Sequence, residues 1–185
     1  EQPLELGAWT STDFSAVRAD VNSRHTGALG LTIGGAFFGS PTDVSVSASD
    51  SSGPALATGV GQTLHAAWFE RTGSSIELYS AVRSSSGVWT APHGIFGNLA
   101  PSDTKLPAGY RPELATDNTG RDHIVWRSWP DGNVYYAVSD PGTGWLVYLV
   151  ASSLDEGALP RMAVEPGGTA HISWHAASPS RTDVY

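Results

Sequence analysis

The sequence predicts an all-β protein, a β-propeller made of four-stranded antiparallel blades, and a repeated motif is the first reason. A proline, a histidine and a tryptophan recur three times, with 11 residues from proline to histidine and 3 from histidine to tryptophan. Successive motifs begin 58 and 48 residues apart, which is close to the length of one propeller blade. The three sets are Pro54, His65 and Trp68; Pro112, His123 and Trp126; and Pro160, His171 and Trp174, with Gly61, Gly120 and Gly168 in the turns between.

The second reason is that each unit divides into four short strand-like segments. The proline stands at the start of the first segment, where a strand tolerates it because no ladder N–H is lost. Glycine, serine, aspartate and proline bound the segments, as expected for tight β-hairpins. The expected strands are residues 56–58, a strand ending at Trp68, 78–82 and 88–90 in the first unit, and 114–116, a strand ending at Trp126, 134–138 and 144–147 in the second.

The third reason is that no window carries a sustained 3.6-residue apolar period with helix caps, so we expect almost no helix. Neighbouring blades must bury their flat faces, and large aromatic rings fill such layers well. We therefore expect Trp68, Trp126 and Trp174 to pack between blades. We expect the repeated histidines to hydrogen-bond within their blades and to bind no metal, because equivalent positions on neighbouring blades lie too far apart for one ion.

The ends of the chain resemble fragments of blades. Residues 7–10 match the fourth strand at 87–90, and residues 183–185 match the opening of the third strand at 133–135. The predicted division is 1–17 as the fourth strand of a shared blade, 18–53 as a divergent blade, 54–100 and 101–153 as blades, and 154–185 as an incomplete blade.

Residues 18–53 leave an alternative open, since they could be an insertion between blades. Within them, 43–50 resemble a third strand, and the apolar segment 29–38 is expected to form one or two buried strands. A closed ring needs at least about four blades. We expect a second polypeptide or another copy of the chain to complete a larger ring. The alternative is that this chain closes alone as a small propeller.

Composition narrows the class of protein. The chain has 185 residues, a net charge of −8, 21 glycines, 12 prolines, seven tryptophans and no cysteine. The glycine and proline suit a turn-rich β protein, and the missing cysteines exclude disulfides and thiol catalysis. The negative charge argues against a nucleic-acid partner, and the apolar segment 29–38 is too short to span a membrane. Because the first residue is glutamate, we expect a processed, secreted protein.

The repeat resembles the sialidase-type, or BNR-type, propeller repeat over residues 54–185. Its basis is the Pro-x-Leu-Ala and His-x-x-Trp pattern followed by Val-Tyr-Tyr-Ala-Val at 134–138. Residues 139–145 and 84–89 are degraded versions of that family's Ser-x-Asp-x-Gly-x-x-Trp turn. Residues 110–112 are the nearest match to its aromatic-Arg-Ile-Pro segment, without the isoleucine. The resemblance implies the blade, while a fold alone does not fix a function.

Arginines point to a ligand site. In a propeller, the loops before the first strand and after the second strand open on the same face, and eight of the ten lysines and arginines are assigned to those loops. Arginine binds carboxylate and sulfate through paired N–H groups, so we expect an anionic ligand there. The alternative is that nearby acids simply neutralise ordinary loop charges. The predicted ligand-binding residues are Arg71, Arg111, Arg127 and Arg161, with Trp129 as a stacking platform for a sugar ring.

The sequence contains no nucleophile elbow, phosphate loop or zincin motif, and we expect no cofactor. A carboxylate pair for glycoside hydrolysis has no local spacing, because different blades can supply the two acids. The candidates for catalysis are Asp131, Glu70, His175 and Tyr110. The sequence therefore favours a lectin-like propeller that prefers acidic glycans. A glycoside hydrolase or polysaccharide lyase acting on an acidic sugar is the first alternative, and a protein-interaction scaffold is the second.

Overall fold

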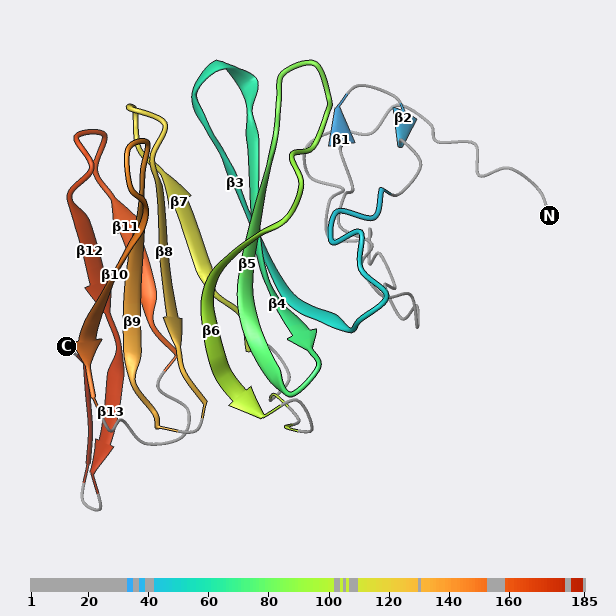
Figure 1. The fold of residues 1–185 in the computed structure, drawn as a ribbon. Helices are drawn as coiled ribbons and strands as arrows, with labels where there is room; N and C mark the ends of the chain where they lie inside the picture. Colours follow the sequence, from blue (N-terminus) through green and yellow to red (C-terminus); the bar gives the residue numbers. More distant parts are fainter. Residues whose placement is uncertain are drawn as a thin grey trace.

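The computed structural model describes residues 33–34, 37–38, 42–101, 104, 106, 110–129, 131–152, 159–178 and 181–184. These residues form antiparallel strands with no α-helix among them, and the single 3₁₀ turn is Val60–Gln62 (Figure 1). The all-β prediction is confirmed. No helix in this described part of the chain is long and apolar enough to cross a membrane.

The first sheet is an antiparallel meander of four strands in chain order. Its strands are β3 (Ser51–Thr58), β4 (Leu64–Thr72), β5 (Ser75–Arg83) and β6 (His93–Pro101). Pro54 lies inside β3 rather than at its start, at a register shift between Ser52 and Ala55. An edge strand accepts proline at such a bulge because no ladder hydrogen bond is lost there.

The fourth strand of the first unit was predicted at 88–90, and that position is wrong. The chain reverses through a tight turn in which Gly87 has φ 92°, and Trp89 forms only an isolated bridge with Arg83. The backbone N–H of Thr90 still donates to the carbonyl of Val82. Pro92 then offers no N–H, and the ladder resumes with β6.

The second sheet repeats the same meander. Its strands are β7 (Glu113–Thr116), β8 (Asp122–Arg127), β9 (Val134–Asp140) and β10 (Gly144–Ala151). All four predicted strands of this unit are confirmed, and the turn glycine Gly120 has φ 84°.

The third unit forms two hairpins, and a small hairpin precedes the first sheet. β11 (Arg161–Val164) pairs with β12 (Ala170–Ser173), and β13 (His175–Ser178) pairs with β14 (Arg181–Val184). Near the N-terminus, β1 (Ile33–Gly34) pairs with β2 (Phe37–Phe38), as expected of strands within 29–38.

Two sequence predictions near the N-terminus have different outcomes. The predicted strand at 43–50 is absent, because Asp43 Oδ1 instead accepts hydrogen bonds from the backbone N–H groups of Ser45 and Val46 and closes a turn. The predicted strand within 1–17 lies outside the described residues.

The sheets follow one another across the molecule in chain order (Figure 1). Their first strands are neighbours, since β3 contacts β7 and β7 contacts β11. The main core lies between the first and second sheets, where Phe69 and Leu78 share a cluster with Trp126. A smaller core on the other face of the first sheet joins Trp68 to Val44. Trp68 and Trp126 are both fully buried. Trp126 packs between the first and second sheets as predicted, whereas Trp68 packs on the face of the first sheet turned away from the second.

Candidate functional site

Two exposed arginines meet at one carboxylate where β7 and β11 begin. Arg111 precedes β7, and its Nη2 lies 3.7 Å from Glu113 Oε1. Arg161, the first residue of β11, places Nη1 on the same oxygen. Their side chains are 52% and 61% exposed, while that of Glu113 is 25% exposed. The second and third units thus bring two predicted ligand-binding arginines together around an acid that the sequence analysis missed.

Arg127 and Arg71 lie on strands rather than on the predicted loops. Arg127 ends β8 and is buried, with its guanidinium carbon 5.5 Å from the centre of the Trp129 ring. Arg71 lies in β4, its Nε 3.6 Å from Asp50 Oδ2, and its Nη2 donates to the carbonyl of Thr104. The strands run further than expected because β4 and β8 keep pairing with β5 and β9 beyond Trp68 and Trp126.

Tyr110 braces the same end of the second sheet. Its buried hydroxyl donates to the carbonyl oxygen of Arg127, and its ring meets Trp129 edge-on at 5.9 Å and Phe69 at 5.3 Å. Burial raises the pKa of Tyr110; Arg127 opposes this rise and Asp131 adds to it. Because the phenol stays protonated and already has an acceptor, Tyr110 positions its neighbours and is poorly placed for acid–base catalysis.

The other candidates for catalysis are dispersed. Asp131 lies in the loop after β8, where its two oxygens accept hydrogen bonds from the backbone and side chain of Asn133. Glu70 is buried on the opposite face of the first sheet from Phe69, and therefore from Tyr110, which packs on Phe69. His175 begins β13, and its side chain is outside the described set. The described residues thus show no pairing of acids around Tyr110.

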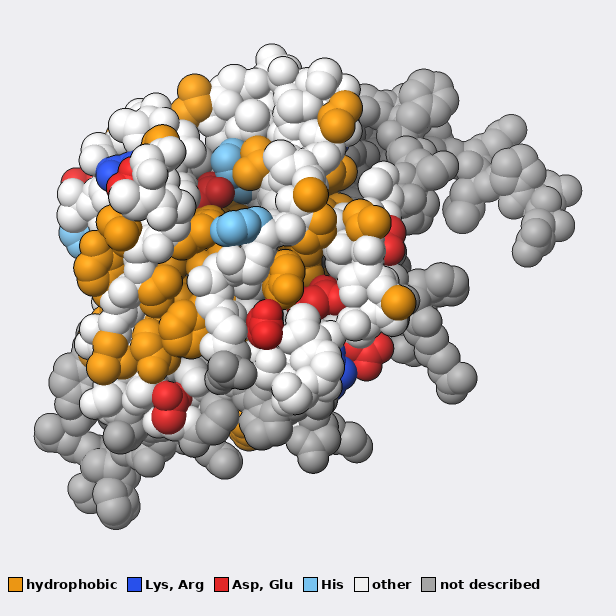
Figure 2. Space-filling view, viewed as in Figure 1, with side chains coloured by type: hydrophobic (Ala, Val, Ile, Leu, Met, Phe, Trp, Pro, Cys, Tyr) orange, Lys and Arg blue, Asp and Glu red, His pale blue; other side chains and the backbone are white. Residues whose placement is uncertain are grey.

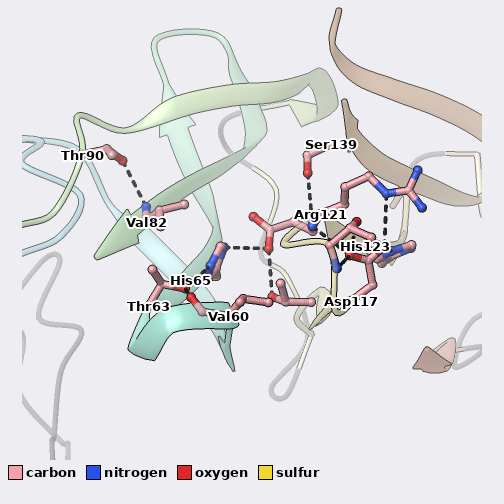
Figure 3. Close-up of polar contacts among 12 residues, drawn as sticks. Val60, Thr63, His65, Val82, Thr90, Asp117, Arg121, His123 and Ser139 are labelled. Atoms are coloured by element: carbon pink, nitrogen blue, oxygen red, sulfur yellow. Dashed lines mark hydrogen bonds and ion pairs between the residues drawn. The ribbon is translucent and has the colours of Figure 1, made fainter. Parts of the chain in front are cut away.

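Two of the repeated histidines, His65 and His123, hold polar clusters in the turns between first and second strands (Figure 3). His65 Nε2 lies 2.9 Å from Thr63 Oγ1, and its Nδ1 lies 2.7 Å from Asp122 Oδ1 on the second sheet. His123 has Nε2 3.3 Å from Asp117 Oδ2 and Nδ1 2.6 Å from the hydroxyl of Tyr136. Both histidines form polar contacts within their own four-stranded unit, as predicted, and His65 also reaches the next sheet.

Asp117 is the most strongly perturbed carboxylate of these clusters. Burial raises its pKa, but hydrogen bonds from Thr119, from the backbone and guanidinium of Arg121, and from His123 outweigh burial and hold the pKa well below its usual range. Sequence reasoning missed this aspartate. An acid directly after the repeated first strand, at Asp117 and Glu165, was the available signal, because His171 Nε2 lies 2.9 Å from Glu165 Oε1.

Among the described residues, no group of three or more histidines and acids is arranged to hold a metal ion. Comparison with known proteins finds no matching family model, no similar curated protein and no similar solved structure. The resemblance to sialidase-type repeats therefore stays a prediction.

Proposed function

We propose that this protein is a carbohydrate-binding, lectin-like β-propeller that prefers acidic glycans. The observation that carries the proposal is the convergence of Arg111 and Arg161, from two units, on the single carboxylate of Glu113. Because two guanidiniums surround one carboxylate, this cluster carries a net positive charge, although the whole protein has a net charge of −8. The exposed N–H groups that Glu113 does not use are suited to a second carboxylate, that of a sugar acid.

Trp129 supplies the second element of the proposed site. Its ring is half-buried and held from two sides, by the guanidinium of Arg127 and by the ring edge of Tyr110. A ring fixed in this way loses little conformational freedom when a ligand stacks on it, which favours binding. A sugar ring presents the apolar C–H face that stacks on an aromatic side chain.

The propeller arrangement belongs to the same proposal. Two four-stranded meanders whose first strands lie side by side, with a third unit beginning beside them, support blades around a common axis. Hydrophobic side chains gather over β9 and β10 (Figure 2), and Leu146 and Tyr148 of β10 are exposed. We propose that outer strands from another chain or copy cover this patch and complete a larger ring, in a protein that acts outside the cell.

Binding is favoured over glycoside hydrolysis because Glu70 and Tyr110 lie on opposite sides of the first sheet and Asp131 is occupied by Asn133. A hydrolase needs two carboxyl groups within about 5–10 Å across the scissile bond. Incubation with sialosides and uronate oligomers distinguishes the two functions, because an enzyme releases product where a lectin only binds.

The test is isothermal titration of the parent and of an Arg111→Gln/Arg161→Gln variant with uronate and sialylated oligosaccharides. Both side chains are exposed, so the fold should stay intact. We expect at least a tenfold loss of affinity, about 1.4 kcal/mol, for charge-assisted contacts removed from a partly desolvated site. Arg83→Gln, a change outside this cluster, is the matched control and should bind as the parent does. Equal affinity in the double variant, or no binding at millimolar glycan, overturns the proposal.

A further inference from the structure

A buried histidine and a buried aspartate meet where the first and second sheets touch. His65 on β4 places Nδ1 2.7 Å from Oδ1 of Asp122, the first residue of β8. Their side chains are 8% and 7% exposed. Nδ1 makes no aligned hydrogen bond with any described atom, so this close contact depends on the charges of the two groups. A buried charge is costly unless an opposite charge accompanies it, and the protonation of this pair therefore matters for packing.

The other ring nitrogen of His65 carries a proton. Thr63 Oγ1 donates to the carbonyl oxygen of Val60 at 3.0 Å, since a carbonyl oxygen can only accept. A hydroxyl group has one proton to donate. Thr63 Oγ1 therefore accepts from His65 Nε2, which lies 2.9 Å away (Figure 3). A neutral imidazole has a single N–H, and in His65 that N–H is at Nε2.

In a neutral ring, Nδ1 would then turn a lone pair toward the carboxylate. Asp122 Oδ1 is itself an acceptor and already accepts a hydrogen bond from Thr116 Oγ1 at 3.0 Å. Two acceptor atoms 2.7 Å apart repel each other. A second proton, on Nδ1, removes this repulsion and places an imidazolium beside a carboxylate. The contacts thus require one proton more than a neutral histidine and an ionised aspartate hold.

Asp122 is the charged group that answers His65 in the described part of the chain. The register partners of His65 on β3 and β5 are Ala57 and Val82, which carry no charge. His93 on β6 shares this face but is exposed and lies two strands away. The charged groups near Asp122 on the second sheet have partners of their own. They are Asp117, Arg121 and His123, which pair with one another, and Asp140, which closes its own turn.

His123, the equivalent residue of the next repeat, needs no second proton. Its Nε2 lies 3.3 Å from Asp117 Oδ2, and its Nδ1 lies 2.6 Å from the hydroxyl of Tyr136. Burial raises the pKa of Tyr136 although Arg121 opposes the rise, so the phenol keeps its proton and donates it to Nδ1. Both nitrogens are satisfied with one N–H, at Nε2. The two histidines differ because Nδ1 faces a hydroxyl in one repeat and a carboxylate in the other.

We infer that His65 and Asp122 form a pH-sensitive joint between the first and second sheets. The joint holds a proton that a histidine in an unfolded chain releases near about pH 6.5. A proton held more tightly in the folded state stabilises that state below this pH, and the contribution is lost as the pH rises. The two sheets therefore pack more firmly in mildly acidic than in alkaline surroundings. The joint lies at the other end of β7 from Glu113 and does not depend on the proposed glycan function.

Thermal melts of the full chain at about pH 5.5 and about pH 8.5, on either side of the ordinary histidine pKa of about 6.5, test the inference. The parent should melt about 2–4 °C lower at the higher pH. His65→Gln should lose most of that difference, because no group then titrates at the joint. Asp122→Asn should lose it too, because an amide can donate to a neutral ring. His123→Gln is the matched control and should keep it. A difference in His65→Gln equal to that of the parent overturns the inference.

Nitrogen NMR of the imidazole rings gives a second readout that does not depend on stability. Long-range ¹H–¹⁵N spectra distinguish a ring with two N–H groups from a ring with one, and His65→Gln assigns the signals. At about pH 7.5, one unit above the ordinary histidine pKa, we expect two N–H groups on His65 and one, at Nε2, on His123. If His65→Gln does not fold, the loss of the second N–H in Asp122→Asn assigns His65 instead. A single N–H on His65 in the parent at that pH overturns the inference.

Discussion

The first and second sheets carry the same repeat but use its histidine differently. In the first sheet, Gly59 follows β3, and His65 reaches Asp122 on the neighbouring sheet. A Cβ at Gly59 would lie 2.4 Å from His65 Nε2, so no acid fits there. In the second sheet, Asp117 takes the place of Gly59 and holds His123 from its own hairpin. The repeat fixes where each histidine lies, and residues outside the repeat decide whether it joins two sheets or braces one.

The tryptophans show a second contrast between the two sheets. Trp68 donates its indole N–H to Glu70, two residues further along β4. Trp126 has Ser128 at the equivalent position, and Ser128 Oγ instead donates to the carbonyl of Leu99. Trp126 is surrounded by rings, stacked on Tyr135 at 5.7 Å. Trp68 thus anchors a row of polar side chains and Trp126 an aromatic cluster. Mutations can therefore test the two sheets separately.

The largest expected effect is that of Trp126→Ala. Truncating this fully buried ring opens a cavity between the first and second sheets and should lower the free energy of unfolding by about 3–5 kcal/mol. Urea denaturation followed by far-UV circular dichroism measures the change. Trp89→Ala, a half-buried ring on the other face of the first sheet, is the control and should cost clearly less. A midpoint for Trp126→Ala equal to that of the parent would contradict the assigned core.

Asp117→Asn is the next largest change, because it weakens hydrogen bonds to a buried charge. Losing one such charged hydrogen bond should cost about 1.5–3 kcal/mol at neutral pH. The pKa of Asp117 is depressed in the folded state, so its contribution is fully present above the ordinary aspartate pKa of about 4. It is lost as the pH falls from there toward the folded-state pKa.

Stability measured against pH therefore separates Asp117 from other acids. The parent should lose stability progressively below about pH 4, while Asp117→Asn should show a flatter curve in the same range. Glu165→Gln, at the equivalent but exposed position of the third unit, should follow the parent. Parallel curves for the parent and Asp117→Asn would show that Asp117 does not carry the acid sensitivity.

The second sheet could be predicted from the sequence more completely than the first. Its four strands are bounded by turns whose residues are local, such as Gly120 and the Asp140–Gly144 hairpin, where Asp140 accepts from the N–H of Gly142. The position of β6 was missed because it depends on pairing with β5 after an interrupted turn, and hence on contacts distant in sequence. Most strands of the two sheets are thus encoded by local sequence. The start of β6, after the interrupted turn that follows β5, is not.

The candidate site shows the same limit. Arg111 and Arg161 were predicted as ligand residues, but their common partner Glu113 lies 48 residues from Arg161 and could not be paired from spacing. Arg127 was expected on a loop, yet Tyr110 and Trp129 enclose it. Side-chain type and repeat position indicated which charged residues are candidates for the ligand site. Burial and pairing arise from segments that only the fold brings together.

The contact between the sheets is tested by Asp122→Asn. The amide keeps an oxygen near His65 and Thr116, whose Oγ1 donates to Asp122 at 3.0 Å, but it removes the charge. We expect a loss of about 1 kcal/mol, the net value of one hydrogen bond. A double-mutant cycle with His65→Gln should show coupling, whereas a cycle with His123→Gln should not. Equal coupling to both histidines would contradict the division of roles between the two sheets.

The smallest expected effect is that of Gly120→Ala in a hairpin turn of the second unit, compared with Gly168→Ala in the equivalent turn of the third unit. Gly120 has φ 84° and an open surrounding, so Gly120→Ala suffers only the backbone strain of the left-handed region. That strain costs about 1–2 kcal/mol, and the stiffer unfolded chain returns about 0.4–1 kcal/mol, which leaves a loss of about 0.5–1 kcal/mol. Gly168 has a similar φ of 90°, but a Cβ there would lie 2.7 Å from Asp117 Oδ2 and 2.6 Å from Arg121 Nη2. Gly168→Ala should therefore cost more than Gly120→Ala in chemical denaturation and should shift the acid unfolding of the parent toward higher pH, because it displaces the groups that keep Asp117 ionised. Equal losses for the two alanine variants would mean that the third unit does not pack on the Asp117 turn.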